Sequence, residues 1–160
     1  MAGPRGGFDA VVILTGSRNW TDTEVLEDMF TSMRTLGGVL YVLGDCPTGL
    51  DKLAYDIITR DSLWFHRWYA DWRRLGKSAG MDRNQLMVDD AESEIVLPDR
   101  RLPSCCLGYP TETSVGTWDC LRRSRKALIR SVDVTALLRT TPSPDWASLP
   151  DVPDIQQTLL

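Results

Sequence analysis

The sequence predicts an α/β domain, a Rossmann-like three-layer fold with a mostly parallel sheet of about five strands. Two observations predict it. Short, unbroken apolar runs at residues 10–14 and 39–43 are typical of strands buried on both faces of a parallel sheet. Segments with helical spacing of apolar residues separate such runs, and strands that alternate with helices form parallel sheets through right-handed crossovers.

The first half of the chain gives the clearest elements. The strand at residues 10–14 precedes a helix that Thr21 or Asp22 can cap and that Gly37 and Gly38 end. The strand at 39–43 leads through a turn into an amphipathic helix over residues 50–58. Residues 63–69 alternate in side-chain character and are rich in aromatic residues, which predicts a third strand. A polar segment at 71–83 then runs into a helix through residues 86–88.

The second half is less regular. Residues 95–97 and 105–107 both have strand character, and Pro98 and Pro103 interrupt the region between them. We predict a loop at 98–103 and the fourth core strand at 104–109. A helix from Gly116 or Thr117 to Leu128 and a last strand near 131–135 complete a domain over residues 8–138. The Pro-rich tail, residues 139–160, is typical of a linker, but its apolar residues could dock on the body or on a neighbouring subunit. These are Trp146, Leu149, Ile155, Leu159 and Leu160.

Composition narrows the possible functions. The 160 residues are 42% hydrophobic and 25% charged, which suits one domain with a core. The net charge of −4 does not favour nucleic acid as a partner. The apolar runs are too short for a membrane helix or a signal peptide, so we expect a cytoplasmic protein with no membrane partner. The four cysteines form no C-x-x-C pair and the single His66 lies far from them, so we expect neither a metal nor a cofactor.

Four candidate loops follow predicted strands, where an open α/β sheet binds its ligands. The first comprises Thr15, Gly16, Ser17 and Arg18, with Trp20 close behind. Gly16 allows close backbone approach, Ser17 offers a hydroxyl and an amide, and Arg18 offers a forked donor for phosphate. The loop matches neither G-x-G-x-x-G nor a Walker motif. The alternative is an ordinary turn with a surface arginine.

The second loop runs from Gly44 to Asp51 and opens a helix. Thr48 and Gly49 would present free amides to an anion at the helix N-terminus. Asp45 is unfavourable there, because a carboxylate repels phosphate. Asp51 could bind a ribose hydroxyl or could simply favour the helix dipole.

The remaining candidates lie on the third and fourth loops. Trp72 could stack on a base or pack on the body, and Lys77, Arg83 and Asn84 could contact the ligand. On the fourth loop, Ser114, Gly116 and Thr117 would hold phosphate at another helix N-terminus. Asp119, one turn into that helix, could act as a general acid or base, bind ribose, or serve as a plain cap. The basic run 122–126 is either a solvated helix face or an anion-binding rim.

Together these motifs resemble the YspA-like subgroup of the SLOG superfamily. The shared patterns are T-G-S-R-x-W, G-x-x-x-G-x-D, A-D-W followed by G-K-x-A-G and R-N-x-x-M, and S-x-G-T-W-D-C. The resemblance implies a Rossmann-like fold that binds nucleotides or nucleotide-derived ligands. Its best-known enzymes are phosphoribohydrolases, which cleave the N-glycosidic bond of adenosine-monophosphate derivatives.

The match to the phosphoribohydrolase motif is partial. Arg83, Gly116 and Thr117 match it, but its Glu position falls on Cys120, with Asp119 one residue earlier. The double glycine of that loop is missing, and Asp45 stands where the YspA-like subgroup usually has glycine. Our leading hypothesis is therefore a nucleotide-binding protein, expected to form a homo-oligomer. The alternatives are a nucleoside-monophosphate N-glycosidase with Arg83 and Asp119 as catalytic residues, and a structural or interaction protein.

Overall fold

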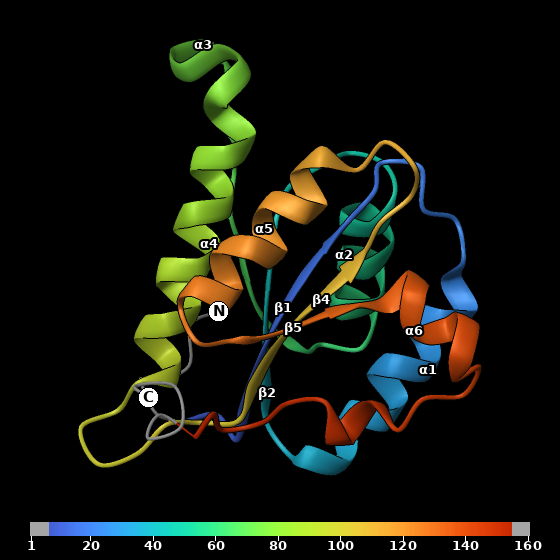
Figure 1. Ribbon diagram of the computed structural model, residues 1–160, viewed down its shortest axis with the longest axis vertical. Helices are drawn as coiled ribbons and strands as arrows, with labels where there is room; N and C mark the ends of the chain where they lie inside the picture. The colour runs from blue at the N-terminus through green and yellow to red at the C-terminus, as the bar shows by residue number, and fades with distance from the viewer. Residues whose placement is uncertain (1–6, 155–160) are drawn as a thin grey trace.

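The computed structural model describes residues 7–154, which form three layers around one parallel sheet (Figure 1). The sheet has five strands in the order β3-β2-β1-β4-β5, and every pair is parallel. The strands are β1 (Ala10–Gly16), β2 (Val39–Leu43), β3 (Trp64–Arg67), β4 (Ser104–Tyr109) and β5 (Arg130–Asp133). The predicted fold class is confirmed, because the unbroken apolar runs form the central strands, which are covered on both faces.

Helices cover the two faces of the sheet unequally. One face carries α1 (Thr23–Met33), α2 (Leu50–Arg60) and α6 (Val134–Thr140), and the other carries α4 (Ala79–Ile95) and α5 (Val115–Lys126) (Figure 1). Alternation along β1 supplies both cores: Val12 packs in the first, and Val11 and Ile13 pack in the second. Because β1 contributes side chains to an apolar core on each face of the sheet, its sequence is a continuous hydrophobic run.

The strand order places a topological switch point between β1 and β4. The chain builds β1, β2 and β3 outward in one direction, then α4 carries it back across to β4 on the other side of β1. The loops that follow β1 and β4 therefore leave the sheet toward opposite faces. Open α/β sheets bind their ligands in the crevice that this separation creates.

Several predicted boundaries were wrong. The segment predicted as polar loop, 71–83, contains a single turn, α3 (Trp72–Leu75), a 3₁₀ turn (Gly76–Ser78) and the start of α4. The favoured fourth strand, 104–109, is confirmed as β4, whereas the other candidate segment, 95–97, begins with the last residue of α4. The last strand stops at Asp133, because that side chain accepts a hydrogen bond from the Ala136 amide and caps α6, a helix that was not predicted. Asp22 does cap α1, as predicted.

The described part of the tail belongs to the body. Trp146 and Leu149 are buried in the core on the α1 side of the sheet, and Asp151 forms an antiparallel bridge with Ser104. Of the alternatives for the tail, a linker or a segment docked on the body, the described residues show the second. Ile155, Leu159 and Leu160 lie outside the described residues. In the described range, none of the helices combines the length and the apolar character that spanning a bilayer requires.

Candidate ligand-binding pocket

A pocket of about 370 Å³ opens at the carboxyl edge of the sheet, beside the switch point. The loops after β1 and β2, the first half of α4 and the start of α5 form its walls. Thirteen of the candidate residues line it: Thr15, Gly16, Ser17, Arg18, Gly44, Asp51, Trp72, Lys77, Arg83, Asn84, Ser114, Gly116 and Thr117. Four others, Trp20, Thr48, Gly49 and Asp119, do not.

Ser17 joins three loops rather than offering free donors. Its Oγ lies 2.7 Å from Oγ1 of Thr111 and accepts a hydrogen bond from the Asn19 amide at 3.0 Å. Its amide donates to the Tyr109 carbonyl, and its own carbonyl accepts from the Leu50 amide. The expected role of the Ser17 hydroxyl as a phosphate donor is therefore corrected, because these contacts already occupy it.

Gly49 also has a structural role. Its φ is +73°, and a Cβ at this position would lie 2.2 Å from the Ser17 carbonyl oxygen and 2.5 Å from the Cα of Arg18. The residue therefore allows the loop after β2 to pack against the loop after β1. Because the Ser17 carbonyl takes the Leu50 amide, the N-terminus of α2 is capped from within the protein. Neither Gly49 nor the neighbouring Thr48 lines the pocket.

Trp20 faces the interior, not the pocket. Its ring packs edge-on against Tyr109, with centroids 5.2 Å apart, and its Nε1 donates to the Asp22 carbonyl. Trp20 or Trp72 could face a base on sequence grounds. Trp72 lines the pocket, whereas Trp20 does not, because its ring packs against the core on the α1 side of the sheet.

Arg83 and Asp45 form an ion pair. The Arg83 Nη1 atom lies 2.7 Å from the Asp45 carboxylate, and both side chains are mostly buried. The pairing matches the negative charge of Asp45 with the positive charge of Arg83. It also changes the role of Arg83, whose guanidinium lines the pocket but already has one carboxylate partner.

Asp51 is the buried carboxyl that lines the pocket. It is 6% exposed, and its Oδ2 accepts a hydrogen bond from the Cys46 amide at 3.1 Å. Burial raises the pKa of Asp51 above its ordinary value, and the nearby Arg83 opposes this shift without cancelling it.

This shift predicts a specific pH dependence. A carboxyl whose pKa is raised by folding stabilises the protein below its unfolded pKa, and that contribution is lost as pH rises through the folded pKa. The free energy of unfolding of wild type should therefore rise relative to that of Asp51→Asn as pH is lowered from about 8 into the carboxyl range. Melting temperatures across this range measure it, with the exposed Asp28→Asn as control. Parallel curves for wild type and D51N would contradict the assignment.

Asp119 does not reach the pocket. It is 2% exposed, and its carboxylate accepts hydrogen bonds from Arg122 Nη2 at 2.6 Å, Arg123 Nε at 2.8 Å and Asn84 Nδ2 at 3.1 Å. The expectation that it acts on a ligand is wrong for this arrangement, because the helix turns it toward α4 and the basic residues of its own last turns. Asn84 also donates to the Gly116 carbonyl, so Asp119 positions the start of α5.

The groups left free around the pocket are donors and cations. Within residues 7–154, neither Arg18 nor Lys77 forms an ion pair. The amides of Gly116 and Thr117 precede the first helical hydrogen bond of α5, from the Trp118 amide to the Ser114 carbonyl, and have no acceptor in this part of the chain. Arg18, Lys77 and these two amides therefore remain available as donors around the pocket, which also contains the buried carboxyl of Asp51.

An aromatic surface lies beside these donors. The guanidinium carbon of Arg18 is 5.8 Å from the centre of the Trp72 ring, which is 48% exposed. Trp72 is therefore the accessible aromatic ring among the lining residues.

Seven lining residues were not among the candidates. They are Asn19, Cys46, Gly80, Met81, Met87, Thr113 and Val115. Three of them, Asn19, Thr113 and Val115, flank a candidate residue in the same loop. The others do not: Cys46 lies two residues after Gly44, and Gly80, Met81 and Met87 lie on α4. Met81 and Met87 could have been found from helical spacing with Arg83 and Asn84, once residues 79–87 were known to be one helix.

The fold and the pocket together define a Rossmann-like α/β protein with a cationic, donor-rich pocket at the switch point of its sheet. No family model matches the sequence. The chain is 31% identical over 129 residues to the gene 61 protein of Mycobacterium phage D29, and the alignment covers 72% of this chain and 89% of that protein. The chain belongs to the family of this phage protein.

Proposed function

We propose that this protein binds a nucleotide or nucleotide-derived ligand and holds it by its phosphate, as a SLOG-type domain. The observation that carries the proposal is the convergence of free donors from three separate segments on one pocket: Arg18, Lys77 and the amides of Gly116 and Thr117. Amides at a helix N-terminus and unpaired cations are the groups that bind phosphate in Rossmann-like folds.

Two further features support a nucleotide over a bare anion. The volume of about 370 Å³ falls within the range of about 300–1,000 Å³ typical of small-molecule sites. The Trp72 ring stands beside Arg18, where a base can stack while the phosphate lies against the guanidinium. Asp51, next to Arg83, supplies an acceptor for a ribose hydroxyl.

The proposal is for binding rather than hydrolysis. The carboxylate assigned to catalysis, Asp119, is occupied by two arginines and Asn84 outside the pocket. Arg83, the other catalytic candidate, is paired with Asp45. Asp119, the acid or base that N-glycosidic hydrolysis would require, therefore does not line the pocket.

A thermal-shift panel of AMP, ADP-ribose and a cyclic dinucleotide tests the proposal. A ligand at about 100 times its Kd should stabilise the wild type by about 2.7 kcal/mol. Arg18→Ala removes a charge-assisted contact and should weaken binding of that ligand by at least about tenfold.

Arg139→Ala is the matched control, because Arg139 is exposed on α6, across the sheet from α4 and α5. It should bind as the wild type does. No stabilisation by any member of the panel, or equal stabilisation of wild type and R18A, would contradict the proposal.

A further inference from the structure

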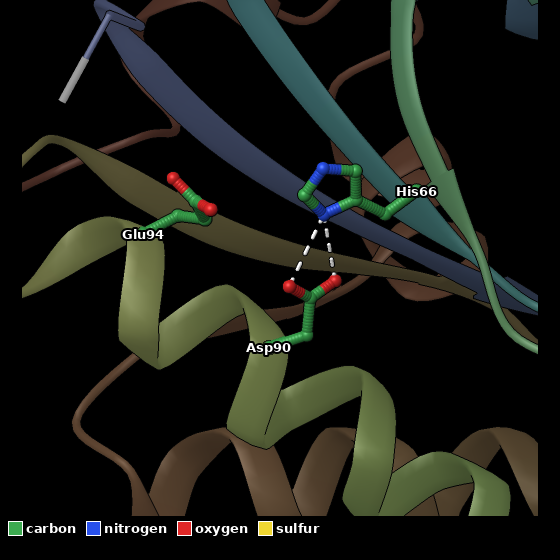
Figure 2. A group of neighbouring side chains, drawn as sticks. All are labelled: His66, Asp90 and Glu94. Carbon is green, nitrogen blue, oxygen red and sulfur yellow. Dashed lines mark hydrogen bonds and ion pairs between the residues drawn. The ribbon is translucent and has the colours of Figure 1, made fainter. Parts of the chain in front are cut away.

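A second cluster of polar side chains lies away from the pocket, between the edge strand β3 and α4 (Figure 2). His66 comes from β3, and Asp90 and Glu94 come from one face of α4, a single turn apart. One nitrogen or oxygen of each residue lies within 4.8 Å of the others. Figure 2 shows all three side chains converging on the same space.

Glu94 is the unusual member. It is 7% exposed, and its Oε2 has no hydrogen-bond partner within residues 7–154. No ion pair involves Glu94 within the described residues, whereas Asp90 is paired with His66 at 2.8 Å. Buried carboxylates are ordinarily paired with a cation or bound to a metal. Within residues 7–154, Glu94 therefore has no cation paired with it.

The surroundings hold the other two groups in place. Trp68 donates from Nε1 to Asp90 Oδ2 at 2.8 Å, and His66 Nδ1 lies 2.8 Å from the same oxygen and 3.1 Å from Oδ1. Outer hydrogen bonds of this kind are what fix ligand orientation in metal sites.

We propose that His66, Asp90 and Glu94 form a binding site for a divalent transition-metal ion such as Zn²⁺. One imidazole nitrogen and two carboxylate oxygens are ligands that such ions accept, and three protein ligands leave a fourth position for water. A neutral imidazole with two carboxylates carries two negative charges, which a divalent ion balances. The side chains of His66 and Asp90 are 19% and 12% exposed, so an ion has a path from solvent.

The geometry requires a small contraction on binding. Ligand atoms about 2.1 Å from a tetrahedral ion lie about 3.4 Å apart. The span of up to 4.8 Å therefore shortens by little more than a bond length, which rotation of the Glu94 side chain can supply. The bound ion would tie β3, an edge strand of four residues, to α4. Glu94 follows Arg83 by eleven helical residues, about 16 Å along α4, so this site is separate from the pocket.

Cysteine and histidine spacing could not reveal this site. Its histidine and first carboxylate are 24 residues apart, and the two carboxylates resemble a solvated helix face in the sequence. The expectation of no metal, drawn from cysteine spacing, did not consider these residues together.

Calorimetric titration of Zn²⁺ into the chelator-treated full chain tests the site. All variants carry Cys46→Ser, because Cys46 is the partly exposed thiol and could bind zinc itself. We expect one ion per chain, with affinity reduced at least about tenfold by His66→Gln or Glu94→Gln. Glu92→Gln, an exposed change on the same helix, should leave the affinity unchanged. No binding up to about 1 mM Zn²⁺, or equal affinity in wild type and both variants, would overturn the proposal.

Thermal unfolding gives an independent readout. Glu94→Gln keeps the shape of the side chain and removes an unpaired buried charge, so the metal-free variant should melt at or above the temperature of the metal-free wild type. Zn²⁺ should raise the melting temperature of the wild type and of E92Q, but not that of E94Q. An equal rise in E94Q would overturn the assignment of Glu94 as a ligand.

Discussion

Replacing Gly49 by alanine should destabilise the protein by at least about 3 kcal/mol, which makes it the most damaging small substitution in the pocket region. The added methyl group would lie 2.2 Å from the Ser17 carbonyl oxygen and 2.5 Å from the Arg18 Cα, and the backbone φ of +73° already disfavours alanine. Because the nearest atoms are backbone, no side-chain rotation relieves the clash. The two loops must separate, so ligand binding at Arg18 should weaken as well.

Urea unfolding of G49A measures this loss, and Gly116→Ala is the matched control. Gly116 also lies in a pocket loop, but a Cβ there meets nothing within 4 Å and the residue is helical. G116A should keep the wild-type fold and gain up to about 1 kcal/mol from helix propensity. G49A and G116A could instead unfold at the same urea concentration. That result would show that the close packing between the loops after β1 and β2 contributes little to stability, and it would contradict the claim that this packing positions Arg18.

Asp119→Ala should cost about 2–4 kcal/mol, because it leaves several donors of a buried cluster without their acceptor. Arg123 Nε and Asn84 Nδ2 both donate to this carboxylate, and Arg123 is only 27% exposed. Loss of the carboxylate also frees Asn84, whose second contact holds the Gly116 carbonyl. The start of α5 should therefore loosen, which lowers ligand affinity without any direct contact between Asp119 and the ligand.

Asp89→Ala is the comparison for this variant. Asp89 is exposed on α4 and accepts one hydrogen bond, from Gln85. Its loss should change the free energy of unfolding by no more than about 0.5 kcal/mol. A D119A protein as stable as D89A would show that the arginine cluster contributes little.

The central strands were predictable because their signal is local. Residues in β1, β2 and β4 are buried on both faces, so their apolar runs are unbroken and unlike those of the amphipathic helices. The α4 start and α6 were not predictable in this way. The glycines at 76 and 80 are residues typical of a loop, although they lie in a 3₁₀ turn and in α4. The helix α6 begins where Asp133 caps it, and the sequence pattern there predicts that the strand continues to residue 135.

The site was predictable only at the level of loops. Topology brings the ends of parallel strands together, so Arg18, Lys77 and Gly116 were placed near one another correctly. Which way each side chain turns depends on partners distant in sequence. Trp20 meets Tyr109 and Asp119 meets Asn84, and neither contact leaves a pattern in the chain.

The central claim is that phosphate lies between Arg18 and the N-terminus of α5. Amide chemical-shift mapping by ¹H–¹⁵N NMR, with AMP titrated into ¹⁵N-labelled full chain, tests it most directly. We expect saturable chemical-shift changes that are largest at the amides of Arg18, Gly116 and Thr117. The next largest change should be at the indole N–H of Trp72. The same titration with R18A should need at least about ten times more ligand. Saturable shifts confined to residues outside the pocket, or shifts in R18A identical to those in the wild type, would contradict the claim.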